Sequence, residues 1–161
     1  RKRWAGIRCT ERKKDGHRGT EISRLDSVPG KELAKVKQGA DCITEEGKIG
    51  PQSHVTEPAG PARSDAYGSD TAYSEKIVPI IEGVDLLYHE ATFAEEDTIR
   101  ATKTGHSTSR QAAQIAKLAN VKKLMLGHFS ARYTDNKILL NEAKEVFSNT
   151  MLANEGLREK L

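Results

Sequence analysis

An α/β fold is predicted for residues 66–161 of this 161-residue chain, from three observations. Short apolar runs that suit strands alternate with stretches of helical periodicity. Each apolar run ends in a polar or ionisable cluster. Capping or acidic residues that favour the start of a helix then follow. Strands that alternate with helices in this way predict a layered α/β arrangement.

The first predicted unit begins with a short strand at residues 66–67, which leads to the cluster around Asp70. A helix is expected over about 74–82 and should end at Gly83. Pro79 lies inside this segment and should shorten or kink the helix, because proline has no backbone N–H to donate.

The second and third units follow the same order. A strand over residues 84–88 leads to His89 and Glu90, and acidic residues then favour a helix N-terminus. In the third unit, Thr108 and Gln111 are spaced as a capping box. The helix that they start has small and apolar residues on one face. This face comprises Ala112, Ile115, Ala116 and Ala119.

The fourth unit is a strand over residues 122–126 that ends beside His128. Asp135 or Asn136 can cap the helix that follows. The apolar stripe of this helix comprises Leu139, Ala143, Val146 and Phe147. Side chains at the ends of neighbouring strands converge in α/β sheets. We therefore expect a shared edge for residues that are far apart in sequence, namely Asp70, His89, Glu90 and His128.

Residues 1–65 have a different character. Most of the glycines and all but one of the prolines lie here, which predicts a loop-rich region with a thin core. A short helix ending at Gly39 and a small hairpin over residues 41–49 are expected within it. Arginine and lysine are concentrated in residues 1–24. This excess suits either a phosphate-bearing partner or a solvated basic arm.

Cysteine usage and hydropathy bear on the compartment. Cys9 and Cys42 are isolated, so neither a disulfide scaffold nor a cysteine zinc site is indicated, which fits a reducing cytoplasm. No stretch approaches the roughly 18 apolar residues of a membrane span, and no apolar run follows the basic start as in a signal peptide. We expect a soluble cytoplasmic protein with no membrane contact.

Three of the five histidines lie at element boundaries in the second half. Taken singly, each such histidine, and Asp70 likewise, is more often structural than functional. Histidine and aspartate gathered at strand ends, however, suit zinc or manganese, which can make water acidic enough to attack an ester or phosphodiester. The competing interpretation is a Ser/His/Asp site using Ser107 or Ser130. Neither serine lies in a Gly-x-Ser-x-Gly elbow, and no glycine-rich phosphate loop is present.

Four ordered motifs resemble a known family. They are Ser69-Asp70-Thr71, His89-Glu90-Ala91-Thr92, His106-Ser107-Thr108 and His128-Phe129-Ser130-Ala131-Arg132-Tyr133. In order and spacing they resemble the C-terminal motifs of ribonuclease Z, the tRNA 3′-processing endonuclease of the metallo-β-lactamase fold. The resemblance implies that residues 66–161 are the C-terminal half of an αββα sandwich domain. Residues 1–65 would be a partial strand, a flexible tRNA-binding arm and a connection.

The resemblance also implies roles for individual side chains. Asp70 looks like the carboxylate that bridges two zinc ions, and His128 looks like a terminal ligand of the second. His106 looks like the residue that protonates the leaving oxygen. Glu90 would orient it, since a carboxylate holds the imidazole tautomer and favours its protonated form. We expect His89 to be structural.

Residues 28–39 resemble the flexible arm that grips tRNA, in which Lys31, Lys35 and Lys37 would contact phosphates. The HxHxDH signature, which supplies most zinc ligands in this family, is not found in this sequence. His17 and His54 are isolated and do not replace it. We therefore expect the chain alone to bind zinc weakly and not to cleave RNA.

The implied reaction is hydrolysis of precursor tRNA downstream of the discriminator nucleotide, which leaves a 3′-hydroxyl, by a homodimeric zinc enzyme. Two alternatives stay open. One is a catalytically inactive, tRNA-binding or dimerising remnant. The other is a different metallo-β-lactamase-fold hydrolase that acts on small esters. The arm-like segment and the motifs at His89 and His106 argue against this second alternative.

Overall fold

The structure is a computed structural model that describes residues 5–10, 17–18, 35–36, 38–43, 49–50, 56–57 and 62–159. The chain divides into two units. The first comprises Arg1–Thr10 and Arg63–Leu161, and the second comprises Glu11–Ala62. Each unit is described by itself. Lys31 and Lys37 of the predicted arm lie outside the described residues.

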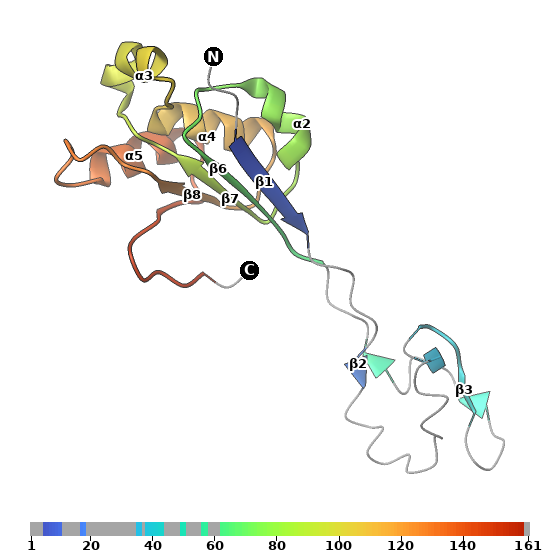
Figure 1. Ribbon diagram of the computed structural model, residues 1–161. Helices are drawn as coiled ribbons and strands as arrows, with labels where there is room; N and C mark the ends of the chain where they lie inside the picture. The colour runs from blue at the N-terminus through green and yellow to red at the C-terminus, as the bar shows by residue number, and fades with distance from the viewer. Residues whose placement is uncertain are drawn as a thin grey trace. The chain divides into compact units, whose positions relative to one another are not determined.

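A five-stranded sheet forms the centre of the first unit, in the order β1-β6-β7-β8-β9 (Figure 1). Strands β6 to β9 are parallel, and β1 pairs antiparallel with β6 at the edge. The strands are β1 (Ala5–Thr10), β6 (Ser64–Ser69), β7 (Leu86–Glu90), β8 (Leu124–Gly127) and β9 (Thr150–Leu152). The predicted α/β arrangement is confirmed in this unit.

Helices connect the parallel strands β6 to β9 and cover one face of the sheet (Figure 1). They are the 3-10 turns η3 (Glu75–Ile77) and η4 (Glu95–Asp97), and the helices α2 (Val78–Ile81), α3 (Thr98–Thr104), α4 (Ser109–Leu118) and α5 (Lys137–Val146). The core between α4 and the sheet includes Ile115, Leu87, Leu124 and Leu126, all with 0% exposure. In the described part of the chain, no helix is long and apolar enough to span a membrane.

The predicted start and buried face of α4 are confirmed. The Thr108 side chain accepts a hydrogen bond from the Gln111 N–H, and the Gln111 side chain accepts one from the Thr108 N–H. This reciprocal capping box satisfies donors that the first helical turn leaves unpaired. The apolar face predicted for α4 is fully buried, and it comprises Ala112, Ile115, Ala116 and Ala119. The His106-Ser107-Thr108 motif is therefore held by a well-defined helix start, because Thr108 is the residue that caps α4.

The helix predicted over residues 74–82 is instead two short pieces, η3 and α2. Pro79 lies in the first turn of α2, where its missing N–H costs nothing because first-turn N–H groups have no intrahelical partner. Gly83 follows with φ of 67°, a left-handed conformation that suits glycine, as predicted. At α5, Asp135 rather than Asn136 supplies the capping bond, since its Oδ1 accepts from the Lys137 N–H at 2.9 Å.

Two strands have no apolar signature in the sequence. β1 lies at the sheet edge, and four of its residues, 7–10, are exposed. β6 begins at Ser64, two residues before the predicted start at residue 66. Ser64 is buried, and Asp85 accepts hydrogen bonds from its N–H at 2.7 Å and its hydroxyl at 3.2 Å. Lys122 also donates to Asp85 at 2.6 Å, and this bond holds the pKa of the Asp85 carboxyl below its usual value.

The second face of the sheet carries a continuous apolar row. In register across the five strands lie Ile7, Tyr67, Tyr88, Met125 and Met151. Ile7 is 65% exposed and Tyr67 48% exposed, and the Tyr67 and Tyr88 rings stack with centroids 4.5 Å apart. Parallel strands are usually covered on both faces. This row is therefore a surface suited to packing against another element.

The second unit contains two short antiparallel pairs. β2 (His17–Arg18) pairs with β5 (Thr56–Glu57), and β3 (Cys42–Ile43) pairs with β4 (Ile49–Gly50). The second pair confirms the predicted hairpin. Residues 35–36 are helical, and Gly39 has φ of 109° where the predicted helix was expected to end.

Candidate functional site

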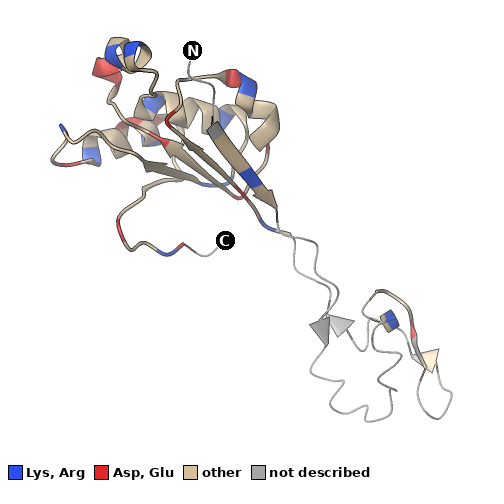
Figure 2. Cartoon of the chain, in the orientation of Figure 1, with Lys and Arg blue, Asp and Glu red and all other residues tan. Residues whose placement is uncertain are grey.

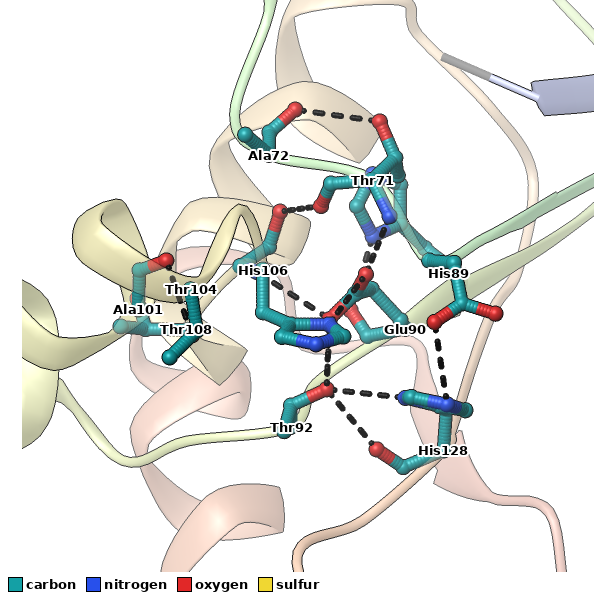
Figure 3. A network of polar contacts seen from close by, with 12 residues as sticks. Thr71, Ala72, His89, Glu90, Thr92, Ala101, Thr104, His106, Thr108 and His128 are labelled. Carbon is teal, nitrogen blue, oxygen red and sulfur yellow. Dashed lines mark hydrogen bonds and ion pairs between the residues drawn. The ribbon is translucent and has the colours of Figure 1, made fainter. Parts of the chain in front are cut away.

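The predicted site residues lie at one edge of the sheet, where β6, β7 and β8 end. Asp70 directly follows β6, Glu90 is the last residue of β7, and His128 directly follows β8. His106 reaches the same edge from the connection between α3 and α4 (Figure 3). Four residues that are far apart in the sequence therefore meet, as expected for the carboxyl ends of neighbouring parallel strands.

Two of these residues have unusual backbone conformations. Asp70 has φ of 52° and His128 has φ of 56°, in the left-handed region that residues with a Cβ seldom adopt. Each such residue costs about 1 kcal/mol or more. Sharp left-handed turns at these two positions redirect the chain at the ends of β6 and β8. They also bring the two side chains toward one another.

Asp70, His106 and His128 form a cluster that could hold a metal ion. Each offers one ligand atom, and these atoms lie within 4.8 Å of one another. Nε2 of His128 is 3.5 Å from Oδ1 of Asp70. The rings of His106 and His128 stack with centroids 5.4 Å apart. One carboxylate oxygen and two imidazole nitrogens are ligands that zinc accepts, so the donor set fits zinc.

Glu90 is the buried centre of the polar network (Figure 3), with a side-chain exposure of 0%. Its Oε1 accepts the Thr71 N–H, and its Oε2 accepts the Ser107 N–H at 3.1 Å and the Thr92 hydroxyl at 2.6 Å. Nδ1 of His106 lies 3.0 Å from Oε2 and 3.2 Å from Oε1. All of these neighbours are donors, which is what a buried carboxylate needs.

The orientation of His106 follows from this contact. A carboxylate can only accept, so Nδ1 of His106 carries the hydrogen and Nε2 is the nitrogen available to a ligand or substrate. The Phe93 ring packs against the imidazole in a T-shaped arrangement, with centroids 6.2 Å apart. The side chain is 15% exposed. His106 is thus held on one side and open on the other.

No role was predicted for Thr92, although its hydroxyl is part of this network. Its Oγ1 lies 2.6 Å from Oε2 of Glu90 and 2.9 Å from Nδ1 of His128. The sequence feature that could have indicated a role for Thr92 is its position, two residues beyond Glu90 and just past the end of a strand. Such a hydroxyl can turn back toward the side chain at the strand end.

His89 points away from the other residues, contrary to the expectation of a shared edge, and its burial agrees with the structural role that was also expected for it. Successive side chains of a strand point to opposite faces, so His89 enters the core while Glu90 faces the site. His89 is 1% exposed, and its Nδ1 lies 2.8 Å from the Glu90 carbonyl oxygen. Burial lowers the pKa of His89, because it disfavours the charged ring.

The last motif is anchored beside the site through Tyr133. The Tyr133 hydroxyl accepts the Ala94 N–H at 2.8 Å and donates to Asp97 at 3.0 Å, and Arg132 also bonds Asp97 at 2.9 Å. The hydrogen bond from Tyr133 has the largest effect on the pKa of Asp97, and together with the bond from Arg132 it lowers that pKa.

Charged residues of the first unit lie mainly on its helices and loops (Figure 2).

Two arginines lie against the ring of Phe93, which is a neighbour of His106. The guanidinium groups of Arg100 and Arg132 lie 6.0 and 5.4 Å from the centroid of the Phe93 ring, which itself packs against His106. Contact between a guanidinium and an aromatic face is favourable and restrains the arginine. Arg100 and Arg132 are thus held beside Phe93.

The chain is similar in sequence to ribonuclease Z proteins. The chain is 49% identical, over 95% of its length, to ribonuclease Z from Parabacteroides distasonis, and the match covers 50% of that protein. It is 47% identical over 94% of its length to ribonuclease Z from Bacteroides thetaiotaomicron, of which 48% is covered. Over this length the chain is a relative of ribonuclease Z. It spans about half the length of the curated ribonuclease Z proteins that it matches. No family model matches the chain.

A solved structure supports the same fold. The metallo-β-lactamase-fold protein YhfI from Bacillus subtilis matches with a TM-score of 0.55 and 32% identity. The match covers 59% of this chain and 39% of YhfI. The resemblance to ribonuclease Z and the metallo-β-lactamase-like fold, both predicted from the sequence, are thus confirmed.

Proposed function

We propose that this chain is the C-terminal half of a zinc-dependent endoribonuclease that removes the 3′ trailer from precursor tRNA. One observation carries the proposal. In a relative of ribonuclease Z, a metal-competent cluster and a histidine–carboxylate pair meet at the ends of β6, β7 and β8. Phosphodiester hydrolysis needs both kinds of group, because a nucleophile must be activated and a leaving oxygen protonated.

Asp70 and His128 would hold zinc. Both are partly exposed, at 60% and 39% for their side chains, so an ion and its other ligands can reach them. When bound, zinc lowers the pKa of water and stabilises negative charge on phosphate oxygens. The left-handed backbone at both residues fixes the directions from which their side chains enter the site.

His106 would be the proton donor, and Glu90 would orient it. Glu90 holds Nδ1 of His106 and so leaves Nε2 to face the substrate. In its protonated form, with a hydrogen on each ring nitrogen, His106 would deliver the proton of Nε2 to the oxygen that leaves when the phosphodiester is cleaved, and would keep the hydrogen on Nδ1. Because Glu90 is itself held by backbone N–H groups of Thr71 and Ser107, the pair is positioned by two separate loops.

The remaining zinc ligands would come from a region that corresponds to the other half of the ribonuclease Z relatives. The apolar row from Ile7 to Met151 would pack against a second sheet, as an αββα sandwich requires. The site opens at the end of this row, since Tyr88 and Glu90 share one face of β7. Without that second sheet the chain would bind zinc weakly and would not cleave RNA.

Substrate binding would use the basic residues. Lys31, Lys35 and Lys37 would contact tRNA phosphates from the arm, and of these Lys35 is described and exposed. Phosphate contacts by lysine supply affinity with little sequence information. We further propose a cytoplasmic homodimer for the complete enzyme, as the family resemblance implies.

A chimera tests the proposed function. The matching half of the Parabacteroides distasonis ribonuclease Z would be replaced by this chain. We expect the zinc-loaded chimera to cleave precursor tRNA and leave a 3′-hydroxyl, and the chain alone to leave the RNA intact. A folded, zinc-loaded chimera that binds precursor tRNA without cleaving it would favour the inactive remnant. One that cleaves small esters but not RNA would favour a different hydrolase.

A further inference from the structure

The Thr92 hydroxyl lies between two parts of the site that have different tasks. Its Oγ1 is 2.6 Å from Oε2 of Glu90 and 2.9 Å from Nδ1 of His128. Thr92 is 7% exposed and the Glu90 side chain is completely buried. Thr92 therefore connects the Glu90 carboxylate, which orients His106, with the imidazole of His128 (Figure 3). Nε2 of that imidazole lies 3.5 Å from Oδ1 of Asp70.

A threonine hydroxyl has one hydrogen to donate and lone pairs to accept with. Oε2 of Glu90 is its nearest acceptor and belongs to a carboxylate, which forms stronger hydrogen bonds than a neutral group. The His128 carbonyl oxygen, at 3.0 Å, is a weaker second acceptor. With the hydrogen directed to Glu90, a lone pair of Oγ1 is left to accept the Nδ1–H of His128.

We propose that Thr92 is a positioning residue that holds His128 in the tautomer with hydrogen on Nδ1. The lone pair of this tautomer is on Nε2, the atom 3.5 Å from Oδ1 of Asp70. His128 then presents a ligand atom on the side where Asp70 presents another. The metal part of this inference rests on the proposed function, whereas the tautomer follows from the contacts of the chain itself.

Glu90 consequently sets the tautomer of both site histidines by two routes. It accepts directly from Nδ1 of His106 at 3.0 Å and reaches Nδ1 of His128 through Thr92. The contact between Thr92 and Nδ1 of His106 is longer, at 3.4 Å. Loss of the Thr92 hydroxyl should therefore change His128 and leave His106 as it is.

Nitrogen NMR of the histidine rings in the metal-free chain tests this directly. At pH 8.5, well above the pKa of about 6.5 of an ordinary imidazole, long-range ¹⁵N–¹H spectra show which ring nitrogen carries the hydrogen. We expect Nδ1–H for both His106 and His128 in the wild-type chain. A wild-type spectrum with hydrogen on Nε2 of His128 would overturn the proposal, without need of any variant.

Two variants separate a positioning role from a packing role. Thr92→Val keeps the shape and removes the hydroxyl, so His128 should lose its preference for the Nδ1–H tautomer while His106 keeps it. Thr92→Ser restores the hydroxyl and should restore the tautomer. Zinc titrated into the same samples should bind about 10- to 100-fold more weakly to Thr92→Val than to wild type. An unchanged His128 tautomer in Thr92→Val would refute the proposed positioning role of Thr92.

This experiment fails separately from the proposed function, because the tautomer is read without zinc and without RNA. The expected tautomers together with an inactive chimera would support the role of Thr92 and count against the endonuclease. Hydrogen on Nε2 of His128 together with an active chimera would count against the role of Thr92 and support the endonuclease.

Discussion

Nδ1 of His106 lies 3.0 Å from Oε2 of Glu90, a carboxylate that is completely buried. Charge removed from water is tolerated only where donors surround it, and Thr71, Ser107 and Thr92 supply donors as well. The Glu90 network is therefore part of the fold as well as part of the proposed site. Its stability can be measured apart from any activity.

The first prediction concerns Glu90→Gln. Glutamine has the same shape, but its NH₂ group would face donors that now point at Oε1 or Oε2. We expect the free energy of unfolding to fall by about 1–3 kcal/mol, the cost of an unsatisfied buried polar group. Urea denaturation checks this. The matched control is Glu96→Gln, at an exposed position, which should change stability by less than about 0.5 kcal/mol. Equal effects would contradict the account.

Gly127 gives the second prediction. A Cβ at this position would overlap the Tyr88 ring, which stacks on Tyr67. We expect Gly127→Ala to destabilise the chain by about 1–3 kcal/mol, because the ring must leave its stack. In a Tyr88→Ala background the same substitution should cost less than about 1 kcal/mol. Additive losses in this double-mutant cycle would show that the overlap is not the cause.

The third prediction is a pH dependence that arises at His89. Burial lowers the pKa of His89 in the folded chain, whereas an unfolded histidine titrates near about 6.5. Below that pH the unfolded state binds a proton that the folded state does not. The free energy of unfolding therefore keeps its full His89 contribution above about pH 6.5. Below that pH the free energy of unfolding falls, by up to about 1.4 kcal/mol per pH unit.

The variant His89→Asn isolates this contribution. Asparagine can still donate to the Glu90 carbonyl oxygen but does not titrate. Unfolding free energies of both proteins should be measured between pH 7.5 and 5.5. We expect the wild type to lose more stability than His89→Asn over this range. Parallel curves would mean that His89 is not the cause of the pH dependence.

Much of this fold could be predicted from local patterns. The capping box of Thr108 and Gln111 and the buried face of α4 depend on residues close in sequence, and both were found as expected. β1 could not be predicted from its own residues, because an edge strand with exposed side chains carries no apolar alternation; only the family resemblance implied a partial strand in residues 1–65. The two pieces that replace the predicted 74–82 helix reflect Pro79, which is favourable in a first turn and unfavourable inside a helix.

The site could be predicted only in part. Asp70, Glu90, His106 and His128 were selected by motif, and the parallel strands bring them together. Strand alternation separates His89 from Glu90, which a list of strand-end residues does not reveal. The contacts of Thr92 required coordinates, because a hydroxyl can turn toward several partners with similar sequence patterns.

The exposed face of the sheet gives the fourth prediction. Tyr67→Lys places a charge in the apolar row, at a position 48% exposed in this chain. In the chain alone we expect a loss of at most about 1.5 kcal/mol, from the stack with Tyr88. In the chimera the loss should be at least about 2 kcal/mol larger, because the lysine would be buried between two sheets. Equal losses in the two proteins would contradict the proposed packing.

The fifth prediction separates metal binding from proton transfer. Asp70, His106 and His128 all lie close enough together to bind one metal ion, so geometry alone does not assign a separate role to each. Zinc content and precursor-tRNA cleavage are to be measured together in the chimera for Asp70→Ala and His106→Ala. We predict that Asp70→Ala loses both zinc and cleavage, whereas His106→Ala retains most of its zinc and loses cleavage by at least about 100-fold. Equal loss of zinc in the two variants would contradict the account.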